Sequence, residues 1–258
     1  NEDAIEYAAS NELVNVLEKN AVQSRSFNEY LPIGSPEILV ENLSRWGSDE
    51  ILIQCFDRSK KKLGPNINLL KKITNFKKGT PLIYSGGIRN SFDALEIIKN
   101  GADRIIVGYS FFQKLNYDNL TKISNKIGKQ SLILSLPIKI NKNNFYIYNY
   151  VDQNFTDIKK INFDNLDKIV SEILITDMYN EGSYDKFDTR MLKLVNIIKI
   201  PLIFFGGITS QYKVKKILSH KNVSAVGIGN SLNFKEHAYQ SFVLQNRNFF
   251  RKTSYAKK

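Results

Sequence analysis

The chain has 258 residues, of which 42% are hydrophobic, and a net charge of +12. This length suits one large core, and no run approaches the roughly 18 to 20 apolar residues that cross a bilayer. One cysteine, Cys55, excludes an internal disulfide and a thiolate zinc cluster. The single cysteine makes the cytoplasm the expected location, and the lack of a long apolar run predicts no membrane binding. The basic residues are scattered along the chain, so we predict no nucleic-acid binding.

Eight short apolar runs divide the chain, near residues 13–17, 50–54, 81–85, 104–107, 131–136, 172–176, 201–205 and 225–228. They are rich in Val, Ile and Leu, which is typical of parallel strands covered on both faces. Helical patterns lie between them, such as residues 91–100, where Phe92, Leu95 and Ile98 are expected to share one face. Eight alternations of strand and helix predict a closed (β/α)8 TIM barrel rather than an open doubly wound sheet.

Three sequence blocks recur in the same order at an offset of about 120 residues, which is long enough for half a barrel. EILI at residues 50–53 recurs at 172–175, PLIYSGGI at 81–88 becomes PLIFFGGI at 201–208, and VGYS at 107–110 becomes IGNS at 228–231. We therefore predict two similar half-barrels, about residues 11–122 and 130–245. They lie in one domain that covers residues 1–258 and ends in a basic tail, residues 246–258.

Glycines follow the third, fourth, seventh and eighth predicted strands. Glycine lets backbone N–H groups approach an anion, and a helix that begins there adds a partial positive charge. In a (β/α)8 barrel these loops meet at one mouth. The pattern predicts two phosphate cradles, one in each half: Gly86, Gly87, Gly108 and Ser110, and Gly206, Gly207, Gly229 and Ser231. The alternative interpretation is that the glycines only permit tight turns.

Carboxylates after the second and sixth predicted strands are candidates for a general acid or base. They are Asp57, Asp177, Glu181 and Asp185, and solvated loop acids are the alternative interpretation. His220 and His237 are isolated and form neither a metal pair nor a triad. Cys55 lies within a predicted strand and is interpreted as a small buried residue. The sequence predicts no metal site and no cofactor.

Five blocks in order carry a family resemblance: DEIL at 49–52, SGGI at 85–88, GADR at 101–104, EILIT at 172–176 and FGG at 205–207. Over nearly the whole chain they resemble the cyclase subunit of imidazole glycerol phosphate synthase, a lyase of histidine biosynthesis. The resemblance implies a ligand with two phosphates at the barrel mouth, bound by Gly86, Gly87, Gly206, Gly207 and Ser231. It also implies a polar bore that receives ammonia from a glutaminase subunit docked at the opposite face, forming a heterodimer. The charged ring at the ammonia entrance falls on Glu50, Arg104 and Glu172, and an acid that contacts the glutaminase falls on Asp103.

The two catalytic Asp positions of that family are substituted in this chain. One falls on Leu17, or on Glu18 if the register shifts by one residue, and the other falls on Pro137. A one-residue shift points a strand side chain to the other face. Proline has no ionisable group, and loss of an acid or base costs at least about 10²-fold in proton transfer. The substitutions argue against histidine-pathway cyclization, unless Glu18, Asp57 or Asp177 act as substitute acids.

Two more segments resemble a paralogous branch that is linked to amidation of surface-polysaccharide sugars: DRS at 57–59 followed by GPN at 64–66, and SLNFK at 231–235 with AYQS at 238–241. This resemblance implies a barrel in an amidotransferase complex with a glutaminase and a separate sugar amidotransferase. Two alternatives stay open. One is a functional cyclase subunit of imidazole glycerol phosphate synthase, and the other is a non-catalytic barrel that binds a phosphate-bearing small molecule.

Overall fold

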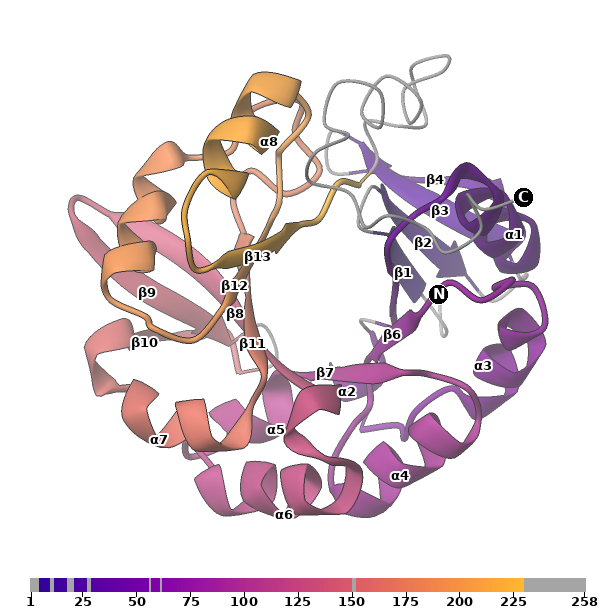
Figure 1. The fold of residues 1–258 in the computed structure, drawn as a ribbon, viewed down its shortest axis with the longest axis horizontal. Helices are drawn as coiled ribbons and strands as arrows, with labels where there is room; N and C mark the ends of the chain where they lie inside the picture. Colours follow the sequence, from indigo (N-terminus) through magenta and orange to yellow (C-terminus); the bar gives the residue numbers. More distant parts are fainter. Residues whose placement is uncertain are drawn as a thin grey trace.

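The computed structural model describes residues 5–9, 12–17, 21–26, 29–55, 57–60, 62–149 and 152–229, and side chains from residue 35 onward except at residues 57 and 60. Strands and helices alternate around a central axis (Figure 1). Among the described strands, seven run parallel: β5 (Ile51–Gln54), β6 (Leu82–Ser85), β7 (Arg104–Val107), β8 (Leu132–Asn141), β11 (Glu172–Asp177), β12 (Leu202–Phe205) and β13 (Val223–Val226). They are neighbours in chain order within one curled sheet. The predicted fold class, a (β/α)8 barrel, is confirmed.

The first predicted strand, residues 13–17, is also a strand, but its pairing differs from the prediction. It forms part of β2 (Glu12–Leu17), in an antiparallel series with β1 (Ile5–Ala9), β3 (Ala21–Ser26) and β4 (Glu29–Gly34). β1 joins this series to β5 in antiparallel register. The expectation of a parallel strand at residues 13–17 is therefore wrong, because β1 occupies the edge of β5 that a parallel neighbour would need.

The helices cover the outside of the ring (Figure 1). The longer ones are α1 (Pro36–Trp46), α3 (Ile67–Thr74), α4 (Ser91–Lys99), α6 (Tyr117–Ile127), α7 (Phe163–Ile169) and α8 (Gln211–Leu218). Shorter segments are α2 (Asp57–Lys60), α5 (Tyr109–Phe112), η1 (Lys129–Ser131), η2 (Ile158–Lys160) and η3 (Thr189–Asn196). Side chains cap the N-termini of α3, α4, α6, α7 and α8, and these caps are Asn66, Asn90, Asn116, Asn162 and Ser210. Asparagine and serine oxygens accept the backbone N–H groups that a helix start leaves unpaired.

The orientation of α4 corrects one expectation. Phe92 is 76% exposed, whereas Asp93, Ala94 and Ile97 form the buried face of this helix. Asn90 caps the helix and so sets its first turn, and Asp93 is drawn inward because it accepts the backbone N–H of Arg89 at 2.9 Å. The prediction that Phe92 shares a core-facing stripe is wrong, because a polar contact at the helix start outweighs the burial of one ring.

The fifth predicted strand is longer than its apolar run. β8 continues to Asn141 and turns back as β9 (Asn144–Asn149), which pairs antiparallel with it, and β10 (Asn154–Asp157) follows. Figure 1 shows this three-stranded extension outside the ring of barrel strands, beside α7. The alternating pattern of the segment accounts for it: Ile138, Phe145 and Ile147 are buried, and their neighbours are not.

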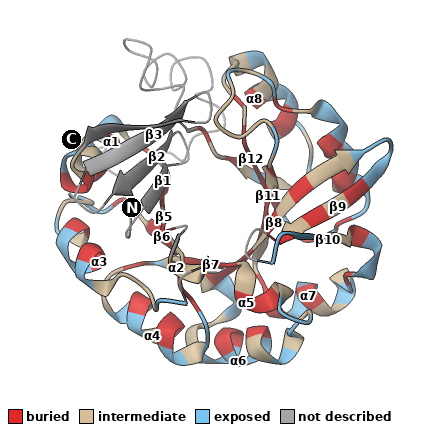
Figure 2. Cartoon of the chain, turned by 180° about the vertical axis from the view of Figure 1, so that it is seen from behind, coloured by how far each residue is buried: buried red, intermediate tan, exposed pale blue. Residues whose placement is uncertain are grey.

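Buried apolar residues form two separate clusters, visible as red bands on strands and inner helix faces in Figure 2. The outer cluster lies between strands and helices and includes Ile53, Leu70 and Ile97. The inner cluster, on the opposite face of the strands, consists of Leu52, Ile83, Ile106, Ile133, Leu174, Ile203 and Phe205. Burial on both faces explains why the strands read as continuous apolar runs. None of the described helices is long and apolar enough to pass through a bilayer.

Candidate functional site

Three charged side chains meet where the parallel strands begin. Glu50 directly precedes β5, Arg104 is the first residue of β7, and Glu172 is the first residue of β11. The Arg104 guanidinium lies 3.3 Å from a Glu50 carboxylate oxygen and also pairs with the Glu172 carboxylate. Its Nη2 donates to Ser171 Oγ at 3.0 Å as well. The structure thus brings the three ring residues together, and their role in admitting ammonia stays a prediction.

Asp103 lies at the same end of the barrel. Its carboxylate accepts the Leu82 backbone N–H at 2.9 Å and pairs with Lys77 Nζ at 2.7 Å. The side chain is still 46% exposed. It therefore fixes the start of β6 and keeps an accessible oxygen, and its predicted contact with a glutaminase is untested.

An apolar cavity of about 40 Å³ lies inside the barrel, next to the charged ring. Its lining includes Glu50, Ala225 of β13 and the members of the inner cluster other than Ile133. One water-sized molecule needs roughly 10 to 15 Å³, so about three such molecules fit. On the strands whose side chains are described, the expectation of a polar bore is wrong, because the inward side chains beyond the charged ring are aliphatic or aromatic. Such walls suit neutral ammonia better than ammonium, because they offer a cation no partner.

The next layer toward the opposite mouth follows from strand alternation. Residues two positions after an inward apolar residue point the same way. Along β5, β6, β7, β8, β11 and β13 they are Gln54, Ser85, Gly108, Ser135, Thr176 and Gly227, and on β12 this position is Phe205, which already belongs to the inner cluster. The sheet register places Gln54 beside Ser85 and Thr176 beside Pro137. The polar side chains in this mouth layer are neutral amides and hydroxyls. The sequence analysis missed them, although counting two residues past each inward apolar position would have found them.

The first glycine turn follows β6. Gly86 and Gly87 have φ angles of +119° and +69°, which L side chains rarely adopt. A Cβ atom on Gly86 would lie 2.1 Å from the Cys55 carbonyl oxygen, and one on Gly87 would lie 2.6 Å from the Gly64 carbonyl oxygen. Both positions require glycine because the loop after β5 passes directly against this turn. The turn therefore requires glycine for its backbone geometry, and anion binding by the same turn stays a prediction.

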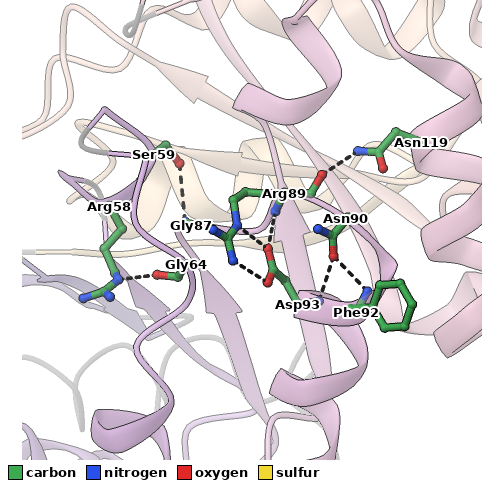
Figure 3. Close-up of polar contacts among 9 residues, drawn as sticks. All are labelled: Arg58, Ser59, Gly64, Gly87, Arg89, Asn90, Phe92, Asp93 and Asn119. Carbon is green, nitrogen blue, oxygen red and sulfur yellow. Dashed lines mark hydrogen bonds and ion pairs between the residues drawn. The ribbon is translucent and has the colours of Figure 1, made fainter.

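Side chains of the loop after β5 hold this turn in place (Figure 3). Ser59 Oγ accepts the Gly87 N–H at 3.4 Å, and Arg58 Nε donates to the Gly64 carbonyl at 2.5 Å. Beside them, Arg89 forms two bonds to the Asp93 carboxylate, at 2.8 and 2.9 Å. The Arg89 guanidinium is thus already paired with a carboxylate, whereas Arg58 is held against the Gly64 carbonyl beside the turn.

The second glycine turn, after β12, repeats this geometry. Gly206 and Gly207 have φ angles of +99° and +67°, and added Cβ atoms would lie 2.8 Å from the Asp177 carbonyl oxygen and 2.6 Å from that of Asn180. A small pocket opens beside the turn, lined by residues that include Gly206, Gly207, Thr209, Gly227 and Gly229. Thr209 Oγ1 is buried, with no hydrogen-bond partner among the described residues. Glycine backbone and an unpaired hydroxyl are the groups that a phosphate cradle uses.

The structure describes the remaining predicted cradle residues except Ser231. Gly108 precedes α5, and Ser110 in its first turn is 8% exposed, with a hydroxyl that finds no partner among the described residues. Gly229 lines the second pocket, and Ser231 lies outside the described residues. In the second half, Gly206, Gly207 and Gly229 line one pocket of the described residues, which supports the predicted cradle there.

Asp177 does not face the mouth. It follows Thr176 and lies on the opposite strand face, with Ile173 and Ile175, and it is 2% exposed. Its carboxylate accepts the Asp188 N–H at 2.9 Å and bonds to the Asn180 side chain at 2.8 Å. Burial raises the pKa of Asp177, and these hydrogen bonds offset the rise only in part. The geometry favours a role in holding the loop after β11 over proton transfer at the mouth.

The other acids of the sequence analysis fall into different settings. Glu18 lies outside the described residues, and Asp57 begins α2 with its side chain outside them. Glu181 is in the loop after β11, where its N–H donates to the Asp177 carbonyl at 2.9 Å. Burial opposes ionisation of Asp185, but the Ser210 N–H at 3.0 Å and Lys213 outweigh it and lower the pKa. Asp185 therefore accepts a hydrogen bond from the N-cap residue of α8. In α4 the comparable acid, Asp93, lies within the helix and accepts the N–H of Arg89.

The isolated residues behave as packing residues. Cys55 is fully buried, as predicted, and His220 follows Ser219, the C-cap of α8. His237 lies outside the described residues. Within the part of the chain that the structure describes, no three side chains of His, Cys, Asp or Glu gather as a metal would require.

These features define a class of protein: a (β/α)8 barrel built from two similar halves, with an ion cluster at the strand starts and paired glycine turns at the opposite mouth. The family model for "Histidine biosynthesis protein" matches residues 14–238. The chain therefore belongs to the histidine biosynthesis protein family, and within it resembles the HisF-type cyclase subunits.

Three relatives illustrate this. A Vibrio vulnificus protein provisionally named imidazole glycerol phosphate synthase subunit hisF2 is 27% identical over 232 residues, which cover 88% of this chain and 84% of the relative. Imidazole glycerol phosphate synthase subunit HisF of Methanococcus vannielii is 26% identical, covering 86% of this chain and 90% of its own length. A second Vibrio vulnificus protein, provisionally named hisF3, is 23% identical, with coverage of 84% and 85%.

Proposed function

We propose that this chain is the barrel subunit of a cytoplasmic ammonia-transferring complex. A glutaminase docks at the end that carries Glu50, Arg104 and Glu172, and ammonia crosses the apolar bore to the mouth. There it is used by a separate sugar amidotransferase to amidate a surface-polysaccharide sugar. The observation that carries this proposal is an apolar cavity beside the charged ring, combined with Pro137 at the strand position where the resemblance places a catalytic acid.

The path is supported by two neighbouring features. The ion cluster supplies polar groups at the strand starts, and the cavity beside it has room for molecules of the size of ammonia. An ammonium ion that loses its proton among the carboxylates would enter apolar surroundings as the neutral molecule, because burial disfavours the charged form.

The mouth supports transfer without cyclization. Pro137 stands beside Thr176 in the sheet, where the resemblance places a catalytic acid. The nearest buried acid, Asp177, lies on the other face of β11. The mouth layer on the described strands can bind or orient a ligand by hydrogen bonds, but amides and hydroxyls of ordinary pKa are weak general acids and bases near neutrality.

The test narrows the cavity in a reconstituted system of this chain with a glutaminase and a sugar amidotransferase from the same organism. Ala225→Leu adds bulk to the cavity, and the control Ser224→Leu adds similar bulk at an exposed position of the same strand, where it removes only the hydroxyl bond to the Leu202 carbonyl. We expect Ala225→Leu to lower glutamine-dependent amidation at least about tenfold and to leave amidation from ammonium salts unchanged, because dissolved ammonia reaches the mouth directly. Ser224→Leu should change neither.

Equal losses with both nitrogen sources, or no loss with either, would contradict a bore that carries ammonia. A separate assay addresses the cyclase alternative. Formation of imidazole glycerol phosphate from the two-phosphate substrate and ammonium salts would show a working cyclase and overturn the proposed transfer role. We expect no product, because Pro137 cannot move a proton.

A further inference from the structure

An exposed aromatic surface lies on the β8–β9–β10 extension. The register pairs Lys139 with Tyr146 and Tyr148 with Phe155, so these four side chains share one face, which we call the hairpin face. The Tyr148 and Phe155 ring centroids are 4.9 Å apart, and Phe155 is 44% exposed. The opposite face, with Ile138 and Ile147, is buried in the outer cluster. Phe155 is therefore exposed, and Tyr146 and Tyr148 are half-buried, although an apolar interior lies on the other side of the same strands.

Lys139 links this face to the barrel mouth. Its Nζ lies 4.8 Å from the Phe155 ring centroid and 5.0 Å from the centroid of Tyr179, in the loop after β11. Tyr179 is 57% exposed. No carboxylate of a described residue pairs with this amine, so the two rings hold a positive charge that lacks an anionic partner there. Lys139 follows Pro137 by two positions, and both point toward the mouth.

We propose that the hairpin face binds the nucleoside phosphate portion of the substrate that is amidated at the mouth. Aromatic rings stack on the flat face of a nucleobase, and a lysine amine pairs with phosphate. The hairpin face presents both groups within 5 Å of each other, on the rim of the mouth. This inference rests on the proposed function, because it assigns a substrate class to the same complex.

Nucleotide binding also explains why these rings lie on the side of the strands away from the buried cluster. Rings kept only for packing would face the buried side, where Phe145 already lies. A phosphate that approaches Lys139 meets a cation already oriented by two rings, which lowers the conformational cost of binding. The glycine cradles lie on the other strands of the mouth, so a second phosphate group has a separate place.

The test is a calorimetric titration of the purified chain with uridine 5′-diphosphate and adenosine 5′-diphosphate, beside uridine and inorganic pyrophosphate. We expect at least one nucleoside diphosphate to bind about tenfold more tightly than either fragment. Phe155→Ala, Tyr148→Ala and Lys139→Met should each weaken that binding about tenfold. Tyr212→Ala removes a 74% exposed ring on α8 and should leave it unchanged. Phe155→Leu, which keeps apolar bulk but lacks a flat ring, serves if Phe155→Ala fails to fold.

The proposal is overturned if no nucleoside diphosphate binds, if the hairpin-face variants bind like the parent chain, or if pyrophosphate alone binds as tightly as the nucleotides. The last result would assign binding to phosphate cradles only. The titration uses neither a glutaminase nor ammonia, and Ala225→Leu should not alter it. Loss of nucleotide binding and loss of ammonia transfer are therefore separate outcomes.

Discussion

The two half-barrels keep the same backbone geometry but anchor it with different side chains. Cys55 and Asp177 are equivalent in the repeat, and the carbonyl oxygen of each faces the first glycine of the next turn. In the first half, the loop after β5 is held by the Tyr84 hydroxyl, which accepts the Asn66 N–H at 2.6 Å. In the second half, the loop after β11 is held by the Asp177 carboxylate.

Duplication preserved the backbone geometry of the two turns, but the side chains that hold the adjacent loops changed. The repeat equivalent of Tyr84 is Phe204, which has no hydroxyl and packs at 5.9 Å from the Phe187 ring. Each half therefore has one polar anchor on the outer face of its strands, supplied by the third strand in one half and by the second strand in the other. The glycines of the two turns cannot be replaced in this way, because a Cβ atom on any of them would overlap a backbone carbonyl oxygen.

The largest effect is expected from substitutions that break the shared backbone geometry. Gly86→Ala should lower the free energy of unfolding by about 4 kcal/mol and Gly206→Ala by about 2 to 3 kcal/mol, from positive-φ strain plus overpacking. The order follows from the Cβ distances of 2.1 and 2.8 Å. Urea unfolding measures both. Gly108→Ala is the control, because its Cβ atom would make an ordinary contact of 3.6 Å and its cost should stay below about 1 kcal/mol. Equal costs for all three would contradict the close approach.

The second effect removes the anchor of the second half. Asp177→Asn places an amide against the N–H donors of Asn180 and Asp188, and should cost about 2 kcal/mol at pH 7. The pKa of Asp177 is raised in the folded state, so below this pKa the folded protein binds a proton before the unfolded chain does. Stability of the parent relative to the variant should therefore rise as the pH falls through the folded pKa toward 3.8. Urea midpoints across this range measure it, and a pH-independent difference would argue against a buried, titrating Asp177.

The smallest effect is expected when the equivalent residues of the two halves are exchanged. Tyr84→Phe should cost about 1 kcal/mol, because it leaves the Asn66 N–H without its acceptor. Phe204→Tyr should cost about 1 to 2 kcal/mol, because it buries a hydroxyl beside Phe187. Burial, with Cys55 close by, raises the pKa of Tyr84 well above its usual range, so the hydroxyl stays protonated at ordinary pH. If Phe204→Tyr were stabilising, the two halves would share a polar site that the structure does not show.

Much of the fold was predictable because its signals are local or repeated. Seven of the eight predicted apolar runs became parallel strands, and the offset blocks placed equivalent glycines at equivalent turns. The family resemblance placed Glu50, Arg104 and Glu172 in one charged ring, and the structure brings them together. The strand and turn predictions needed only chain order and the internal repeat.

The face on which a residue lies was decided by tertiary structure. Strands buried on both sides show no hydrophobic alternation, so spacing alone could not reveal that Asp177 faces the helices while Thr176 faces the mouth. For the same reason the apolar bore, the exposed Phe92 and the hairpin face were not foreseen. The amino-acid sequence determines the order of strands, the duplicated turns and where charge gathers. Which side chains meet inside the ring depends on register between strands distant in the chain, which local pattern does not encode.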